Sequence, residues 1–279
     1  MSATDDIIAQ QRAWAASHGL ADAAGYLSTV AANLRAALST QARQAFERGD
    51  GGELKDTASR PAKMRALHSS SALAVNVFDY WTSRDPAPLG GALELGSEVL
   101  SLRFEAQFPT GLDGNPPNLD LAVVLANGTT VGVESKFTEW LHAKTQQRET
   151  FKPKYFPDGP GLWQARGLRQ SQALAQAMGS GAKLFRHFDA AQLLKHALGL
   201  ATQLGDKFAL LYLVYDWPCA EAEAHRGEVQ DFASLVGSEV RFRAVTYQDL
   251  YRRLKAKAGA ADGEYLAYLS RRYFPEERL

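Results

Sequence analysis

The chain has 279 residues, of which 46% are hydrophobic and 22% are charged, so it has the composition of a globular protein and enough length for one large core or two small ones. Lysine plus arginine and aspartate plus glutamate both total 31, which excludes a strong overall positive charge as the basis for nucleic-acid binding. The single cysteine, Cys219, excludes an internal disulfide and a cysteine-based zinc site.

Hydropathy bears on where the protein is located. No apolar run approaches the roughly 20 residues that a membrane-spanning helix needs, and residues 1–11 are acidic and polar instead of basic and then apolar. We therefore expect a cytoplasmic protein with no membrane contact. The sequence leaves a homo-oligomer open.

The first third of the chain has the pattern of helices. Apolar residues recur at helical spacing between residues 5 and 48, most clearly over 27–38, which predicts two or three helices. Glycines and polar residues over 49–61 predict a loop and an internal boundary. The helices expected beyond it cover 64–81, which should be mostly buried, and 92–100.

Strands are predicted in the middle of the chain. Apolar and polar residues alternate over 102–108, as in a strand with one buried face. A loop rich in Gly, Asp, Asn and Pro over 111–118 leads into two further strands, 119–125 and 129–137, which Asn127-Gly128 joins.

The last part of the chain predicts helices around a buried strand. Helical patterns cover 163–178 and 190–204, and the continuously apolar run 208–217 is typical of a strand in the middle of a sheet, covered on both faces. The remaining elements are a helix over 230–236, a short strand over 240–245, a helix over 247–257 and a polar helical tail that ends near Tyr273.

Together these elements predict an α/β fold with a central mixed sheet flanked by helices. We expect a helical N-terminal extension over 1–60, a core over 61–257 and a C-terminal helical tail over 258–279.

Three charged residues interrupt two otherwise apolar strands, and alternation puts Glu134 and Lys136 on the same face of their strand. A two-residue turn would mix polar and apolar residues on both faces of the hairpin. A three-residue loop, 126–128, with Gly128 in the left-handed conformation, instead aligns the apolar residues on one face and sets Asp120 opposite Glu134. Because a one-residue slip exchanges the faces, the pattern selects this second register.

The predicted pair of acids suits a hard divalent cation, Mg²⁺ or Mn²⁺. Directly opposed residues have Cβ atoms roughly 4.5 to 5.5 Å apart, close enough for both carboxylates to hold one ion. The small residues Ala122 and Gly132 on that face are expected to leave room for it. Lys136, roughly 6 to 7 Å further along the strand, can position an attacking water or neutralise transition-state charge. These residue types fit hydrolysis of a phosphodiester bond.

This arrangement resembles the PD-(D/E)XK superfamily of restriction-endonuclease-like enzymes. Glu134-Ser135-Lys136 fits the Glu-x-Lys half of its motif, whereas Asn118-Leu119-Asp120 lacks the usual proline before the aspartate. The longer string 133–139 is similar to a bacterial branch of restriction-endonuclease-like proteins, and the likeness extends over about 64–245. The resemblance implies a restriction-endonuclease-like core, a DNA substrate and catalysis by Asp120, Glu134 and Lys136, with Asp120 and Glu134 as metal ligands.

The resemblance also implies roles outside the hairpin. It assigns Glu105 to the metal site, with Glu98 as the alternative, and makes Glu139 an additional acid. From the helix after the motif it adds Gln192 and Lys195 to the catalytic set.

Other interpretations remain open at this point. A Glu-x-Lys pair can merely solvate the edge of a sheet, the fold can serve a non-catalytic protein that binds nucleic acid or a partner, and the substrate can be another phosphate ester. The basic segments 144–154 and 166–169 are candidates for DNA contact or ordinary solvated faces. The six histidines, including His142, His187, His196 and His225, lack metal-ligand spacing and are interpreted as ordinary residues, and the serines 69–71 as helix caps.

Overall fold

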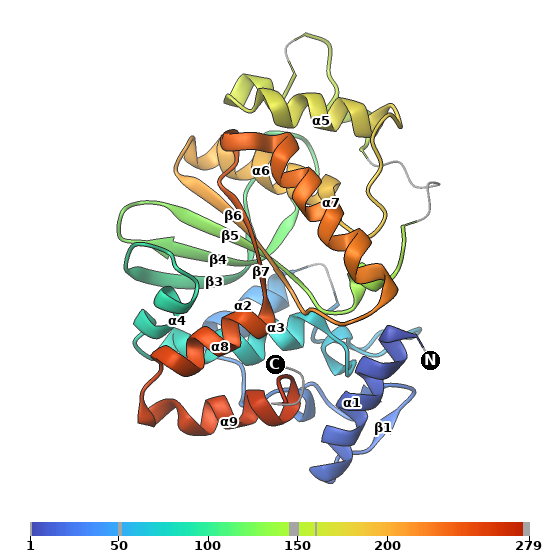
Figure 1. The fold of residues 1–279 in the computed structure, drawn as a ribbon, viewed down its shortest axis with the longest axis vertical. Helices are drawn as coiled ribbons and strands as arrows, with labels where there is room; N and C mark the ends of the chain where they lie inside the picture. Colours follow the sequence, from blue (N-terminus) through green and yellow to red (C-terminus); the bar gives the residue numbers. More distant parts are fainter. Residues whose placement is uncertain (1, 50–51, 145–150, 160, 276–279) are drawn as a thin grey trace.

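A five-stranded mixed sheet forms the centre of the computed structural model, which describes residues 2–49, 52–144, 151–159 and 161–275 (Figure 1). Its strands lie side by side in chain order: β3 (Val99–Gln107), β4 (Asn118–Leu125), β5 (Thr130–Lys136), β6 (Phe208–Val214) and β7 (Phe242–Thr246). The first three strands are antiparallel, and β6 and β7 run parallel to β5. The predicted α/β class with a mixed sheet is confirmed.

Helices lie on both sides of this sheet, with α5, α6 and α7 on one side and α2, α3, α8 and α9 on the other (Figure 1). Their bounds are α1 (Ala3–Ser17), α2 (Thr40–Arg48), α3 (Ser70–Phe78), α4 (Ala87–Ala92), α5 (Arg169–Gly179), α6 (Ala190–Leu204), α7 (Ala220–Val236), α8 (Tyr247–Lys257) and α9 (Gly263–Arg272). A small hairpin near the N-terminus consists of β1 (Asp22–Ala23) and β2 (Tyr26–Leu27). None of the helices in the described ranges has the length and apolar character needed to cross a bilayer.

All five predicted strands form, and β6 lies between β5 and β7 with nearly every side chain buried, as its apolar run predicts. Helices α6 and α8 match their predicted ranges. The predicted helix over 64–81 begins only at Ser70, because the Ser69 side chain accepts the N–H of Ala72 and caps the helix there. The predicted helix over 230–236 is the end of α7, which begins at Ala220.

Two helix predictions are wrong. Residues 92–100 are not helical, since α4 ends at Ala92, Glu94 and Gly96 take positive φ, and β3 begins at Val99. The segment 27–38 contains the end of β2 and a short 3-10 helix, Ala31–Asn33, instead of an α-helix. Its apolar residues are buried by contacts with distant parts of the chain, which helical spacing alone does not distinguish from a helix face.

The hairpin register is as predicted. Leu121 pairs with Val133 and Val123 with Val131, and the loop 126–128 closes with Gly128 at φ +81°. The apolar pattern and the glycine therefore determine which side chains of β4 and β5 share a face.

Gly128→Ala is expected to lower the free energy of unfolding by about 1 kcal/mol, because alanine pays a backbone cost at this positive φ. A Cβ at Gly128 would meet only the Lys207 side chain, at 3.8 Å, so crowding adds little. The matched control is Gly227→Ala in exposed helix α7, where a Cβ meets nothing and alanine should stabilise the helix by roughly 0.5 to 1 kcal/mol. Urea denaturation measures both, and equal stability of Gly128→Ala and wild type would contradict the assignment.

The two ends of the described chain meet at a buried arginine. Arg272 of α9 is fully buried, donates from Nε to Gln11 of α1 at 3.1 Å and donates from Nη1 to the backbone oxygen of Asn33 at 2.8 Å. Its guanidinium also lies over the ring of Trp14, 4.0 Å from the centroid. The N-terminal and C-terminal segments thus pack together, although the predicted boundaries at 60 and 257 stay a prediction.

Candidate active site

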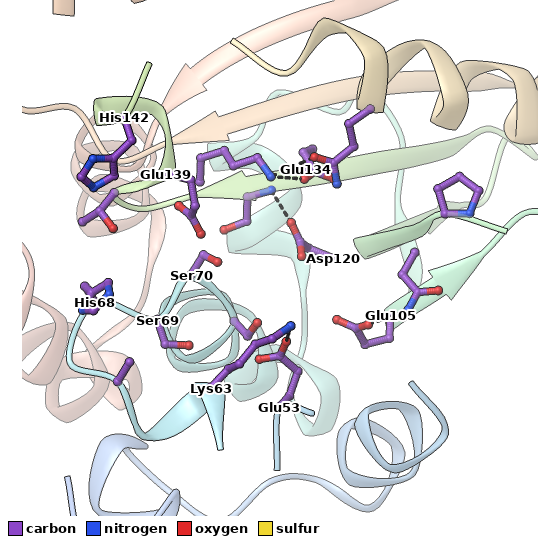
Figure 2. Close-up of a pocket in the computed structure, with 18 of the residues that line it drawn as sticks. Glu53, Lys63, His68, Ser69, Ser70, Glu105, Asp120, Glu134, Glu139 and His142 are labelled. Carbon is purple, nitrogen blue, oxygen red and sulfur yellow. Dashed lines mark hydrogen bonds and ion pairs between the residues drawn. The ribbon is translucent and has the colours of Figure 1, made fainter. Parts of the chain in front are cut away.

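A cleft of about 790 Å³ opens where β4 begins and β5 ends (Figure 2). Asp120, Glu134 and Lys136 all line it, together with Glu105 of β3. Its other wall comes from the N-terminal half of the chain and includes Glu53, Lys63, His68 and Ser69 to Ser71. The structure therefore brings the predicted reaction centre together in one cleft, with residues that are distant in sequence facing it.

Three acids lie in a row across three neighbouring strands. The register that pairs Leu121 with Val133 sets Asp120 opposite Glu134 one step further on. On the other side of β4, the pairs flanking Glu105 set that residue opposite Asp120 as well. The strands β4 and β5 stop pairing at this point, because an oxygen of Asp120 accepts the N–H of Ser135 at 2.7 Å. Asp120, Glu134 and Glu105 thus line one cleft, and the shared metal site expected of the first two stays a prediction.

Glu105 has a strained backbone, with φ +46° inside a strand. Its Oε2 accepts a hydrogen bond from Asn118 at 3.0 Å. Burial raises the pKa of Glu105 to about 7; the Asn118 hydrogen bond opposes this, and the carboxylates of Glu53 and Glu134 add to it. Strained residues with a perturbed pKa in a cleft are typical of functional sites.

The Glu134 carboxylate is buried between two cationic or polar side chains. Its Oε1 accepts a hydrogen bond from Lys136 Nζ at 2.5 Å, and His196 Nε2 lies 3.0 Å from its Oε2. Burial alone would raise the pKa of Glu134, but the Lys136 charge and the His196 contact outweigh it and lower the pKa to about 2. Glu134 is therefore ionised throughout the physiological range.

The pKa values of Asp120 and Lys136 are both raised. Burial and the neighbouring Glu134 charge raise the pKa of Asp120 well above its ordinary value. Burial would lower the pKa of Lys136, but the carboxylates of Glu134, Asp120 and Glu139 outweigh burial and raise it. Lys136 is thus protonated at neutral pH. A further positive charge next to Asp120 would stabilise its ionised carboxylate.

Helix α6 contacts β5 at three positions that are one helical turn apart. Gln192 Oε1 accepts a hydrogen bond from Lys136 Nζ at 3.1 Å, and one turn later His196 contacts Glu134. One turn further, Leu200 Cδ1 would lie 3.1 Å from a Cβ placed on Gly132. Four residues rise about 6 Å on a helix and two residues about 6.6 Å on a strand, so the helix and the strand stay in step.

The role expected for Gly132 needs correction. A Cβ at Gly132 would lie 2.7 Å from Leu119 Cδ1, and Ala122 is fully buried. These small residues therefore make space for the leucine side chains of β4 and α6, not for a cation. The cleft itself begins one step further along both strands, at the acids.

The remaining predicted residues divide into those near the site and those away from it. Gln192 and Glu139 line the cleft, and Glu139 Oε2 accepts the N–H of Phe137 at 2.7 Å. Lys195 does not line the cleft; its Nζ lies over the rings of Phe151 and Tyr155, at 5.1 and 5.5 Å from their centroids. The alternative acid, Glu98, is exposed and lines a different hollow.

The described residues of the two basic segments, 144, 151–154 and 166–169, do not line the cleft. Lys144 forms an ion pair with Asp189, and Lys154 donates to the backbone oxygen of Asp113. Arg148 lies outside the described residues, and the Arg166 and Arg169 side chains are exposed.

Sequence reasoning missed His196 and the N-terminal wall of the cleft. A signal for His196 exists, because Gln192 and His196 are four residues apart and so face the same side of α6 as the pair Lys136 and Glu134 requires. The positions of Glu53, Lys63 and His68 depend on long-range packing, for which the sequence has no local signal.

The donor set suits a hard divalent cation that keeps much of its own water. Within the described ranges, no three His, Cys, Asp or Glu side chains already converge as a closed metal-binding group. Mg²⁺ usually takes only one or two carboxylates from a protein and completes its shell with water and phosphate oxygens. The Oε2 of Glu134 is buried with no well-aligned hydrogen bond, since the His196 contact is short but poorly directed. That acceptor, together with the acids Asp120 and Glu105 that line the same cleft, fits a cation.

Comparison with known proteins adds a family to this geometry. The family model REase-ARP, described as "Restriction Endonuclease associating with ARP", matches residues 11–274. Neither the curated proteins nor the solved structures yielded a match. Because the matched range covers nearly the whole chain, including both walls of the cleft, the chain belongs to this restriction-endonuclease family.

Proposed function

We propose that this chain is a metal-dependent deoxyribonuclease of the PD-(D/E)XK type, which uses Mg²⁺ or Mn²⁺ to hydrolyse DNA phosphodiester bonds as a restriction or defence endonuclease. The observation that carries the proposal is the register that sets Asp120 opposite Glu134, with Lys136 two residues along the same strand face, in an open cleft. Membership of a restriction-endonuclease family supports it.

The charge of the cleft favours dependence on a cation. Its described lining contains five carboxylates, Glu53, Glu105, Asp120, Glu134 and Glu139, and two lysines, Lys63 and Lys136. Even with Glu105 and Asp120 protonated, as their raised pKa values favour, this lining has no net positive charge, so a DNA phosphate gains from an added cation. Asp120 and Glu134 would hold the cation and Glu105 would be a further ligand, with Asp120 and Glu105 losing their protons as the cation binds. A cation there supplies Lewis acidity for the phosphoryl oxygen.

Lys136 acts as a charge and a donor in this proposal. Because its pKa is raised, Nζ is protonated at neutral pH and does not serve as a general base. Its N–H groups can orient the attacking water and stabilise negative charge that develops on the phosphate. Gln192 and Glu134 hold Nζ in place from two sides, at 3.1 and 2.5 Å.

The alternative is a non-catalytic protein that uses this fold to bind nucleic acid or a partner. Its support is the net charge of zero, which leaves no global attraction for DNA. DNA binding that needs no cation, without cleavage, would favour this alternative over the nuclease.

A nuclease assay tests the proposal across single-stranded, duplex, methylated and branched DNA. We expect cleavage of at least one form with Mg²⁺ or Mn²⁺ and none with EDTA. No cleavage of any form with either cation would overturn it.

Asp120→Ala is expected to weaken Mn²⁺ binding by 10-fold or more, because one of the two opposed carboxylates is lost. Titration calorimetry on the purified full chain measures this directly. The control is Asp231→Ala on α7, whose carboxylate pairs with Lys183 at 2.7 Å away from the cleft and should leave Mn²⁺ binding unchanged. Equal Mn²⁺ affinities in wild type and Asp120→Ala would remove Asp120 from the site.

A further inference from the structure

His196 is a buried histidine with one notable neighbour. Its side chain and that of Glu134 are each about 1% exposed, and their Nε2 and Oε2 atoms lie 3.0 Å apart. Within the part of the chain that the structure describes, neither atom has a hydrogen bond of ordinary geometry, so this short contact is the closest polar contact found for either. Because buried polar groups are usually paired, a buried imidazole this close to a buried carboxylate is expected to restrict how that carboxylate is oriented.

The contact belongs to a matched pair on α6. Gln192 and His196 are one helical turn apart, and they meet Lys136 and Glu134, which are two residues apart on β5. One helix face therefore holds both charged residues of the Glu-x-Lys motif. The third step, where Leu200 packs closely on Gly132, anchors the helix against the strand.

We propose that His196 is a positioning residue, which holds the Glu134 carboxylate in the orientation in which it binds the divalent cation of the cleft. This inference rests on the proposed function. Lys136 restrains only the Oε1 side of Glu134, so without His196 the carboxylate could rotate about its last bonds. In this proposal the ring proton of His196 is on Nε2, which lies 3.0 Å from Oε2, and the short contact limits that rotation while leaving a lone pair of the oxygen available.

His196 acts through Glu134 and not on the substrate. Gln192, Glu134 and Lys136 line the cleft, whereas His196 does not line it and contacts Glu134 from its buried position. The residue should therefore affect cation affinity and turnover but not the binding of DNA itself.

The test compares two variants of nearly equal size, His196→Gln, which keeps an N–H donor, and His196→Met, which has none. In Mn²⁺ titration calorimetry on the full chain, His196→Met should weaken binding by roughly 10- to 100-fold, and His196→Gln by no more than about 3-fold. In cleavage assays His196→Met should lower kcat to a similar extent and leave KM for DNA unchanged. Rescue by glutamine distinguishes the donor from mere packing.

The control is His225→Met on α7. His225 is also buried, and its Nε2 lies 2.9 Å from the Tyr212 hydroxyl, away from the cleft lining. The His225→Met variant should be less stable than the wild type and keep its Mn²⁺ affinity.

Equal Mn²⁺ binding by His196→Met and wild type would overturn the proposal, as would equal loss of Mn²⁺ affinity in the glutamine and methionine variants. If His196→Met does not fold, loss of Mn²⁺ binding in folded His196→Gln overturns it. If the wild type binds no Mn²⁺, the proposed function is contradicted as well. If the wild type binds Mn²⁺ and His196→Met binds it equally well, only this inference is contradicted.

Discussion

Glu134→Gln should lower the rate of DNA cleavage by on the order of 10³-fold or more while the protein stays folded. Glutamine has the same shape and can still accept a hydrogen bond from Lys136, but it lacks the negative charge that a cation needs. The buried ammonium of Lys136 loses its nearest counter-charge, and Asp120 loses its nearest repulsive neighbour, so the two effects on stability oppose each other.

The measurement is single-turnover cleavage with saturating Mg²⁺, together with circular dichroism and thermal unfolding of each variant. Glu223→Gln, on the exposed side of α7, is the matched control and should cleave DNA like the wild type. If folded Glu134→Gln cut DNA within 10-fold of the wild-type rate, Glu134 would not be a metal ligand.

The hairpin could be predicted in detail because its determinants are local. Apolar alternation and the requirement for glycine at residue 128 select one register among the common loops, and that register alone places Asp120 opposite Glu134. The sheet order around β6 could be anticipated for the same reason, since a continuous apolar run needs cover on both faces.

Features that depend on distant packing could not be predicted in this way. The apolar residues over 27–38 are buried or partly buried against the rest of the chain, and only the structure shows that this segment holds the end of β2 and a short 3-10 helix. The same holds for the wall of the cleft, because Glu53 and Lys63 reach it from a segment whose sequence reads as a loop.

The helix after the motif lies between these cases. Its existence and bounds were predictable from periodicity, and its polar positions at Gln192 and Lys195 suggested a role for both. The structure divides them, since Gln192 faces β5 and Lys195 faces the aromatic rings of Phe151 and Tyr155. Residues three and four apart both lie near one helix face, about 60° and 40° from each other, so the spacing of Gln192 and Lys195 does not determine which of them faces the strand.

Glu105 should make the cation-free protein less stable as the pH rises, and Glu105→Gln should remove that loss. Its pKa is raised from 4.5 to about 7 in the folded protein, so the folded state keeps a proton that the unfolded state releases between those values. The stability contributed by the protonated form is thus full below about pH 4.5 and is lost as the pH rises toward 7. At pH 8 the cost is about 3 kcal/mol, and at pH 5 about 1 kcal/mol or less.

Thermal unfolding in EDTA at pH 5 and at pH 8 measures this difference. Glu105→Gln should raise Tm by roughly 5 °C at pH 8 and by much less at pH 5, since glutamine can still accept the Asn118 hydrogen bond without a charge. Glu47→Gln, exposed on α2, should change Tm little at either pH.

Added Mn²⁺ should stabilise the wild type more than Glu105→Gln at pH 8, because the cation offsets the charge that the variant lacks. A Tm difference between wild type and Glu105→Gln that is the same at both pH values would mean that Glu105 does not carry the raised pKa and has no place among the ligands.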